Sequence, residues 1–281
     1  MRLGAPVFVD DLTPERWVAA HRDAGYGAAY CPVTAEHDAE TVAAYVKAAQ
    51  DADLVIAEVG AWSNPLSPDE ETRRAALERC RTQLDLADRV GARCCVNIAG
   101  SCGEVWDGPH PDNLTPATFD RIVGVVRDII DAVKPTRTYY TLEAMPWMFP
   151  HTAESYLALI EAIDRDQFGV HVDMVNVINS PQRYFHNADL IRTWFETLGP
   201  HIRSCHAKDT KLSSKLTTHL DEVRPGLGNL DYPVLLQELD RLDPDTPLMI
   251  EHLQTEEAYQ NAADYIRGVA DEVGLAFQPE R

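Results

Sequence analysis

Short apolar runs alternate with longer amphipathic segments along the whole chain. Each apolar run is short enough to be a buried strand, and each following segment has apolar residues at helical spacing. The pattern predicts strands at residues 3–9, 28–33, 54–59, 93–98, 139–143, 168–172, 202–205 and 247–250. It predicts helices at residues 13–25, 38–52, 67–90, 115–134, 154–164, 188–198, 232–242 and 256–273.

Residues that start or stop helices occur where this periodicity places the helix ends. Thr13 stands before Pro14, an N-cap followed by proline at the first helical position. Ser67 begins a second such pattern, which reads as a capping box. Gly25 and Gly91 follow the last apolar positions of their helices.

Eight strand–helix pairs with this period favour a closed (β/α)8 TIM barrel of the α/β class. An open doubly wound sheet is the second choice, and its dinucleotide-binding form lacks a GxGxxG motif after the first strand. No linker rich in Gly or Ser interrupts the alternation. We therefore expect one domain that spans residues 1–281.

The composition of the chain limits the kinds of molecule that we expect it to bind. The chain has 281 residues, is 45% hydrophobic and carries a formal net charge of −20. That charge would repel a phosphate backbone or an anionic bilayer, so we expect neither nucleic acid nor membrane as a partner. No signal peptide or membrane-spanning stretch is visible, so we expect a cytoplasmic protein. Assembly into a homo-oligomer is compatible with the sequence.

Four side chains that can bind a metal follow successive strands. They are Glu143, Asp173, His206 and Glu251. Because parallel strands end at the same mouth of a barrel, these side chains should converge there. One carboxylate in such a place is often only a helix N-cap, but three together need a cation to stay ionised. Oxygen and nitrogen ligands without cysteine favour Mn²⁺ first, then Mg²⁺, Co²⁺ or Zn²⁺.

The sequence resembles a known family over nearly its whole length. The motifs that carry the resemblance are Leu142-Glu143, Val172-Asp173, His206-Ala207-Lys208-Asp209, Arg224-Pro225-Gly226-Leu227-Gly228 and Ile250-Glu251. In order and spacing they are similar to the xylose isomerase-like barrels of the sugar phosphate isomerase/epimerase superfamily. That superfamily includes D-tagatose 3-epimerase, hydroxypyruvate isomerase and inosose dehydratase.

The resemblance implies roles for individual residues. The four strand-end residues would bind the metal, and Glu143 and Glu251 would also form the acid–base pair on opposite faces of a sugar. Arg224 matches the arginine that anchors substrate hydroxyls in epimerases. Asn176 departs from the pattern, because epimerases carry a substrate-contacting histidine at that position. The departure puts the usual ketohexose specificity in doubt.

Other polar and aromatic residues are expected around this centre. Candidates for substrate contact in the loops are Trp62, Trp106, His110, Trp147 and His151, with ordinary loop packing as the alternative for each. Glu58 and Lys208 are further candidates for the wall of the site, and Asp209 for orienting a metal ligand. His171 is expected to point away from Asp173 and to be structural.

The chemistry of such a site leaves three hypotheses. The first is a metal-dependent isomerase or epimerase that acts through an enediolate on a monosaccharide or keto-sugar. The second is a metal-dependent lyase that eliminates a β-substituent from a keto-sugar, like an inosose-type dehydratase or a 3-oxo-glycoside deglycosidase. The third is a non-catalytic sugar-binding subunit, against which the pair Glu143 and Glu251 argues. Endonuclease IV shares the superfamily fold, but the acidic charge speaks against nuclease activity.

Overall fold

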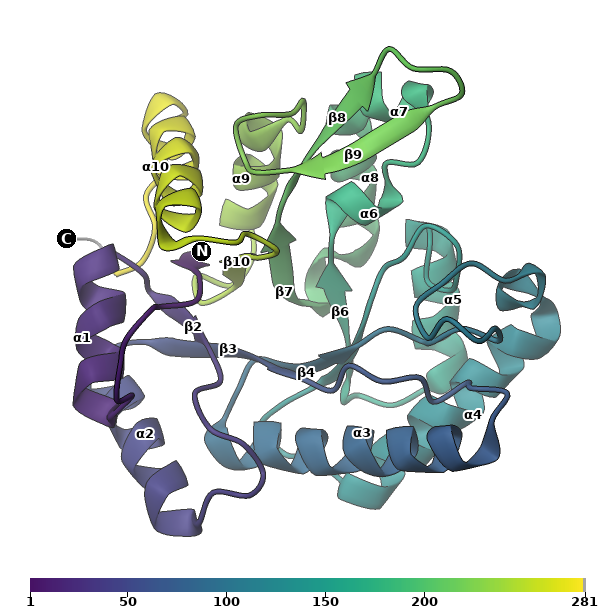
Figure 1. Cartoon of the computed structure of the whole chain (residues 1–281), viewed down its shortest axis with the longest axis horizontal. Helices are drawn as coiled ribbons and strands as arrows, with labels where there is room; N and C mark the ends of the chain where they lie inside the picture. The colour runs from purple at the N-terminus through teal and green to yellow at the C-terminus, as the bar shows by residue number, and fades with distance from the viewer. Residues whose placement is uncertain (280–281) are drawn as a thin grey trace.

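Every predicted apolar run forms a strand, and the eight strands close into a parallel barrel in the order β1-β10-β7-β6-β5-β4-β3-β2. The structure is a computed structural model that describes residues 1–279 (Figure 1). The barrel strands are β1 (Arg2–Gly4), β2 (Ala28–Tyr30), β3 (Val55–Gly60), β4 (Cys94–Asn97), β5 (Tyr140–Glu143), β6 (Phe168–Val172), β7 (Ile202–Ala207) and β10 (Pro247–Ile250). The expected (β/α)8 barrel is confirmed.

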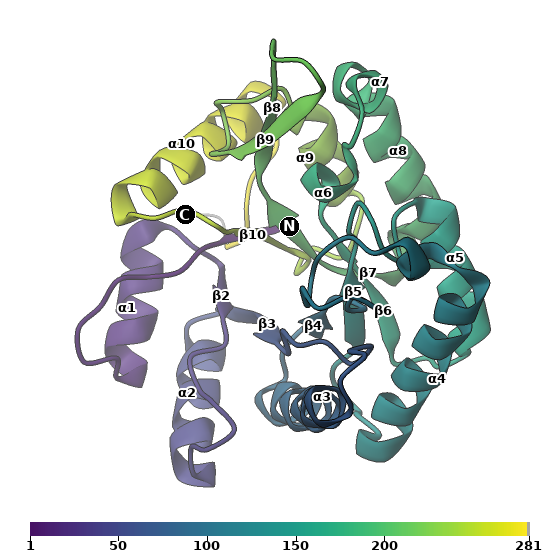
Figure 2. The same ribbon diagram turned by 45° about the vertical axis from the view of Figure 1, so that its right-hand side comes forward.

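Helices surround the strands and bury one apolar face each against them (Figure 2). The long helices are α1 (Pro14–Ala24), α2 (Ala39–Asp51), α3 (Glu70–Val90), α4 (Pro116–Val133), α5 (Ala153–Ile163), α8 (Asn187–Leu198), α9 (Tyr232–Asp240) and α10 (Glu256–Glu272). Side chains of Thr13, Asp38, Thr115, Thr152 and Thr255 cap helix N-termini by accepting backbone N–H groups.

The start of α3 differs from the prediction. Asp69, not Ser67, is the N-cap, and it accepts the N–H of Thr72 at 2.7 Å. Ser67 instead accepts the N–H of Asp69 at 3.2 Å. A carboxylate at the helix N-terminus interacts favourably with the helix dipole, which explains why the charged residue takes the capping position.

Three elements at the carboxyl ends of the strands were not expected. Two are the short helices α6 (Met174–Val177) and α7 (Pro181–Phe185). The third is an antiparallel hairpin of β8 (Asp209–Ser213) and β9 (His219–Val223), which projects beyond the barrel (Figure 1). The hairpin lies between β7 and α9 in the chain and therefore borders the mouth where the strand-end residues lie.

Residues 99–114 form a long loop between β4 and α4, and it ends in a 3-10 turn, η1 (Pro111–Leu114). The buried amide of Asn113 organises it, since it accepts the N–H of Cys102 at 2.9 Å and donates to the carbonyl of Gly108 at 3.1 Å. Within residues 1–279, no helix combines the length and the apolar character that a bilayer span requires.

Candidate metal centre

The four predicted ligands meet at the mouth of the barrel. Glu143 ends β5, Asp173 follows β6, His206 lies in β7 and Glu251 follows β10, and these strands are consecutive neighbours in the barrel. One ligand atom of each lies within 4.8 Å of those of the others. Nδ1 of His206 lies 2.9 Å from Glu251 Oε1, 3.3 Å from Glu143 Oε1 and 3.7 Å from Asp173 Oδ2.

The two carboxylate oxygens of Asp173 have different surroundings. Oδ1 accepts the N–H groups of Val175 and Asn176 at 2.9 and 3.1 Å, so Asp173 is the N-cap of α6. Oδ2 faces the cluster. The helix cap therefore orients the second oxygen toward the centre, and the capping and ligand interpretations both apply to this residue.

Lys208 is buried among the carboxylates. Its Nζ lies 2.7 Å from Glu251 Oε1, 2.8 Å from Asp173 Oδ2, 3.4 Å from Glu222 Oε2 and 3.9 Å from Glu143 Oε1. Four carboxylates thus surround one ammonium group. Such a cluster carries excess negative charge, which a further cation would neutralise.

The donor set fits a divalent cation. Asp173 Oδ2 and Glu251 Oε1 are buried and accept no well-directed hydrogen bond from the described residues, although His206 and Lys208 reach them as ion pairs. Buried carboxylate oxygens without hydrogen bonds are costly unless something else satisfies them. Three carboxylates and one imidazole nitrogen are a chemically suitable ligand set for Mn²⁺, Mg²⁺, Co²⁺ or Zn²⁺.

The pKa values of the cluster members shift in different directions. Burial raises the pKa of Glu143. Burial also acts to raise the pKa of Asp173, but Lys208 and His206 outweigh it and hold this pKa well below its usual range. Burial acts to lower the pKa of His206, yet Glu251, Glu58 and Glu143 raise it well above the ordinary value. A cation must therefore compete with a proton on His206.

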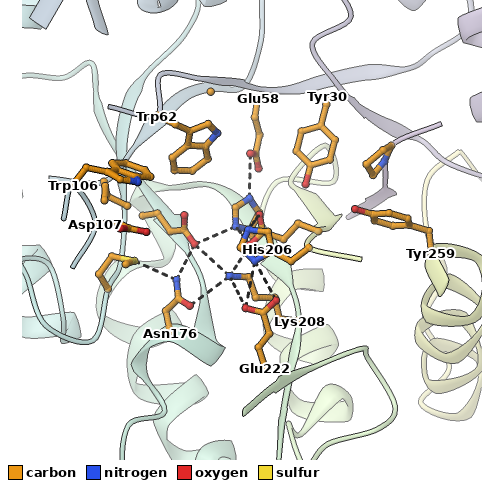
Figure 3. A pocket seen from close by; sticks show the side chains of 17 residues that line it. Tyr30, Glu58, Trp62, Trp106, Asp107, Asn176, His206, Lys208, Glu222 and Tyr259 are labelled. Carbon is orange, nitrogen blue, oxygen red and sulfur yellow. Dashed lines mark hydrogen bonds and ion pairs between the residues drawn. The ribbon is translucent and has the colours of Figure 1, made fainter. Parts of the chain in front are cut away.

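A cavity of about 450 Å³ opens above the cluster. Figure 3 shows Trp62 and Trp106 on one side of it and Tyr259 on the other, with His206 and Lys208 between them. Trp62 and Trp106 are each partly exposed, so their rings offer a flat apolar surface next to polar groups. Tyr30, Ile98 and Met145 complete the apolar lining.

Five of the residues expected around the centre line this cavity: Glu58, Trp62, Trp106, Asn176 and Lys208. Asn176 positions the candidate ligand Glu143, because its Nδ2 donates to Glu143 Oε1 at 2.9 Å and to the carbonyl of Ala144 at 3.2 Å. The side chain that departs from the pattern of the resembling family thus orients Glu143.

Four other candidates do not line the cavity in the described structure. Arg224 donates to the carbonyl of Pro225 at 2.9 Å, and His110 caps η1. Trp147 donates to the carbonyl of Asp107 at 2.8 Å and so supports the loop that carries Trp106. His151 packs edge-on against Phe149.

Asp209 acts on the loop that contains the Gly-x-Gly turn. Its carboxylate accepts the N–H groups of Gly226 and Gly228, both at 3.0 Å, and of Leu230 at 2.9 Å. A side chain at Gly228 would collide with that carboxylate, since an added Cβ would lie 2.2 Å from Asp209 Oδ1. The contacts of Asp209 are thus with the loop backbone.

Sequence reasoning missed several residues of the site. Glu222 arrives on the unexpected hairpin, Tyr30 from β2 and Tyr259 from α10. The expectation that His171 points away from the centre is wrong, because its Nε2 lies 3.0 Å from Glu58 Oε1 inside the barrel. His171 precedes Asp173 by two positions, and residues two apart on a strand share a face, so this signal was present in the sequence.

Comparisons with known proteins agree with this fold. The model of the family described as xylose isomerase-like TIM barrel matches residues 18–269. No curated protein sequence matches the chain.

Solved structures share the fold at low sequence identity. D-Psicose 3-epimerase from Clostridium cellulolyticum, solved with D-tagatose, is 14% identical with a TM-score of 0.69 over 98% of this chain and 100% of that chain. The 3-keto-D-glucoside 4-epimerase of E. coli is 17% identical with a TM-score of 0.65 over 95% and 99%. Endonuclease IV from Thermus thermophilus is 12% identical with a TM-score of 0.72 over 97% and 100%.

Proposed function

Because the chain belongs to the xylose isomerase-like TIM barrel family, we propose that it is a divalent-metal-dependent isomerase or epimerase of a monosaccharide or keto-sugar. The observation that carries the proposal is the convergence of Glu143, Asp173, His206 and Glu251 within 4.8 Å at the base of a cavity of about 450 Å³. The two epimerases of similar fold act on sugars of this kind, which supports the same substrate class.

The four residues have two roles, metal binding and proton transfer. Glu143, Asp173, His206 and Glu251 would hold the cation, Mn²⁺ by preference, and the cation would polarise a substrate carbonyl when bound. Glu251 or Glu143 removes the proton on the carbon next to that carbonyl, which leaves an enediolate. In epimerisation, the other glutamate starts the step protonated and donates its proton to the opposite face of the same carbon. In isomerisation, a proton is added to the former carbonyl carbon, and the hydroxyl proton of the deprotonated carbon moves to the former carbonyl oxygen.

Neighbouring side chains orient the two glutamates and place positive charge beside them. Asn176 donates to Glu143 Oε1 at 2.9 Å and restricts its orientation. The Lys208 ammonium lies 2.7 Å from Glu251 Oε1 and is close enough to stabilise negative charge that develops on the substrate. Trp62, Trp106 and Tyr259 surround the cavity and would exclude water from a bound sugar.

The charge of the cavity favours an uncharged substrate. Its lining includes the carboxylates Glu58, Asp107, Glu143, Glu222 and Glu251, and its cationic side chains are already close to carboxylates. A phosphorylated sugar would bring a dianion into this field and would be repelled. We therefore propose a non-phosphorylated sugar.

A metal-dependent lyase is the second candidate, and the size of the cavity is compatible with it. About 450 Å³ lies within the range of roughly 300–1,000 Å³ of sites for drug-sized ligands, which leaves space for a substituent on the sugar. In this reaction the base removes the same proton, and the β-substituent departs with its bonding electrons. The product is an enone, and a group is released.

Proton NMR in D₂O tests both candidates. The protein is treated with EDTA, its metal loss is verified by elemental analysis, and it is incubated with ketohexoses and 3-keto-glycosides with and without Mn²⁺. The paramagnetic Mn²⁺ is removed with a chelating resin before each spectrum is recorded, because it would broaden the sugar signals. We expect loss of the signal of the proton next to the carbonyl only when Mn²⁺ is present. Appearance of an enone instead would identify the lyase. Equal turnover by the verified metal-free protein would refute metal dependence.

The Glu251→Gln variant tests the acid–base role within the same assay. Turnover should fall by at least about 10²-fold, since a positioned carboxylate base contributes that much to rate. Glu257→Gln is the matched control, because it makes the same substitution at an exposed position of α10. Sugar binding by calorimetry without any turnover across the panel would indicate a binding subunit instead.

A further inference from the structure

A buried group of polar side chains lies just beneath the candidate metal ligands. It consists of Glu58 on β3, His171 on β6 and Ser204 on β7, with exposed fractions of 3%, 0% and 0%. His171 and Ser204 precede Asp173 and His206 by two positions, so they form the next inward-facing layer of the barrel. Chemistry at the four strand-end residues does not by itself require this layer.

Glu58 is fully engaged by its neighbours. Its Oε1 accepts hydrogen bonds from Ser204 Oγ at 2.5 Å and from His171 Nε2 at 3.0 Å. Its Oε2 lies 3.3 Å from His206 Nε2. Strand β3 is not adjacent to β6 or β7 in the barrel, so this carboxylate reaches across the interior to both of them.

The imidazole of His206 therefore faces a carboxylate on each side. Nδ1 points at Glu143, Asp173 and Glu251, whereas Nε2 points at Glu58. A neutral imidazole has one N–H and one lone pair, and the partner of the first nitrogen decides which atom carries the lone pair. Only a proton on Nε2 leaves the lone pair of Nδ1 available for a cation.

We propose that Glu58 is a positioning residue that accepts the Nε2–H of His206 and thereby directs the Nδ1 lone pair into the metal centre. The inference rests on the metal centre of the proposed function. A carboxylate behind a ligating histidine also increases the basicity of the ligand, which strengthens its bond to the cation. Glu58 acts through His206, and so contributes to metal affinity without contacting the cation.

The same side chains could in principle be ligands themselves, because atoms of Glu58, His171 and His206 lie within 4.8 Å of one another. The contacts argue against a second cation there. Ser204 and His171 already donate to Oε1, and a cation on Nε2 of His206 would leave this imidazole to bridge two metals. Hydrogen bonding satisfies Glu58 without either requirement.

The test measures metal binding without any sugar. Metal-free wild type and Glu58→Gln are titrated with Mn²⁺ by calorimetry, and their Co²⁺ forms are compared by visible absorption. Glu58→Gln presents an amide to Nε2, so we expect a 10- to 100-fold weaker Mn²⁺ affinity and a changed Co²⁺ spectrum. Thr141→Val is the matched control, because Thr141 is buried in β5 and its hydroxyl bonds the carbonyl of Cys95. It should retain the wild-type affinity within about threefold, well short of that loss.

Two further readouts keep the test independent of how well the variant folds. Glu58→Asp keeps the charge but shortens the side chain, and should bind Mn²⁺ with intermediate affinity. In Zn²⁺-loaded wild type labelled with ¹⁵N-histidine, NMR should show the His206 proton on Nε2. A proton on Nδ1, or wild-type affinity and spectrum in folded Glu58→Gln, would overturn the proposal.

Stoichiometry separates the remaining outcomes. One Mn²⁺ per wild-type chain is expected. Two ions, one of them lost in Glu58→Gln, would make Glu58 a ligand and overturn its positioning role. A wild type that binds no divalent cation would refute the metal centre of the proposed function itself.

Discussion

At the scale of single residues, the interior of this protein relies on polar side chains that each satisfy several backbone groups. The hydroxyl of Tyr156 lies 3.2 Å from the N–H groups of Leu142 and His171 and 3.1 Å from the carbonyl of Gly169. It therefore links β5 to β6 next to the candidate metal centre. Buried polar groups of this kind stabilise a fold only while their partners remain in place.

His21 should make stability sensitive to pH. It is 2% exposed in α1, its Nδ1 lies 2.8 Å from the carbonyl oxygen of Trp17, and it packs edge-on against the rings of Trp17 and Tyr26. Burial lowers its pKa below the ordinary value of 6.5. The unfolded chain therefore takes up this proton at higher pH than the folded chain, and stability present above pH 6.5 is lost as pH falls through the lowered folded-state pKa.

Thermal unfolding in EDTA between pH 7.5 and 5.5 checks this expectation. The decrease in Tm on acidification should be smaller in His21→Gln than in wild type, whatever the Tm of the variant at pH 7.5. His186→Gln, at an exposed position before α8, should show the wild-type decrease. Equal decreases in wild type and His21→Gln would contradict the role of His21.

At the scale of elements, the barrel closes through its shortest strands. Gly4 of β1 pairs with Ala28 of β2 on one side and with Met249 of β10 on the other. An added Cβ at Gly4 would lie 2.5 Å from the Ala28 carbonyl oxygen and 2.6 Å from the Met249 sulfur. The backbones approach so closely here that the junction requires a residue without a side chain.

Two glycine substitutions should change stability in opposite directions. Gly4→Ala forces backbone displacement at the β1 junction, and we expect it to lower the free energy of unfolding by about 1–3 kcal/mol. Gly124 lies on the exposed side of α4, and a Cβ added there would have open space around it. It should raise the free energy of unfolding by about 0.5–1 kcal/mol, because alanine has the higher helix propensity.

Chemical unfolding monitored by circular dichroism measures both changes with the same protocol. An unchanged or higher midpoint for Gly4→Ala would mean that β1 moves outward at little cost. Destabilisation by Gly124→Ala would contradict the open surroundings of that position.

At the scale of the whole molecule, the net charge of this chain opposes binding to nucleic acid. Endonuclease IV from Thermus thermophilus shares the fold with a TM-score of 0.72 at 12% identity, which leaves activity undecided. The present chain carries a net charge of −20, and its cavity is lined by carboxylates. Both features oppose the approach of a phosphate backbone.

We expect neither binding nor cleavage of DNA that contains an abasic site. For a DNA-binding protein, affinity rises steeply as salt is lowered, because bound counterions are released. For this chain, lower salt should strengthen the repulsion, so a gel-shift assay should show no complex at either 200 or 50 mM salt. Specific cleavage in Mg²⁺ or Mn²⁺, with endonuclease IV as the positive control, would contradict the prediction.

The sequence was most informative where local rules decide structure. Thr13, Asp38 and Thr115 cap the predicted helices, and the apolar runs form the predicted strands with ends that differ by a few residues. The four strand-end side chains converge as expected, since parallel strands in a barrel must end at one mouth. Asp69 rather than Ser67 caps α3, because its carboxylate interacts favourably with the helix dipole.

The sequence was least informative about loops and about contacts across the barrel. Arg224 belongs to a recognised motif yet contacts the Pro225 carbonyl, because Asp209 fixes the path of that loop. Glu222 reaches Lys208 only because the chain folds back as a hairpin. No periodicity predicts either arrangement.

The order of strands and helices, the barrel, and the four polar residues at successive strand ends follow from the sequence alone, because backbone geometry imposes periods of two and 3.6 residues on side chains. Tertiary structure decided that Asn176 holds Glu143 and that Glu58 meets His206 across the interior. It also decided that Trp62, Trp106 and Tyr259 surround one cavity. Such contacts join residues far apart in the chain, and their geometry is set only when the barrel closes and its loops pack.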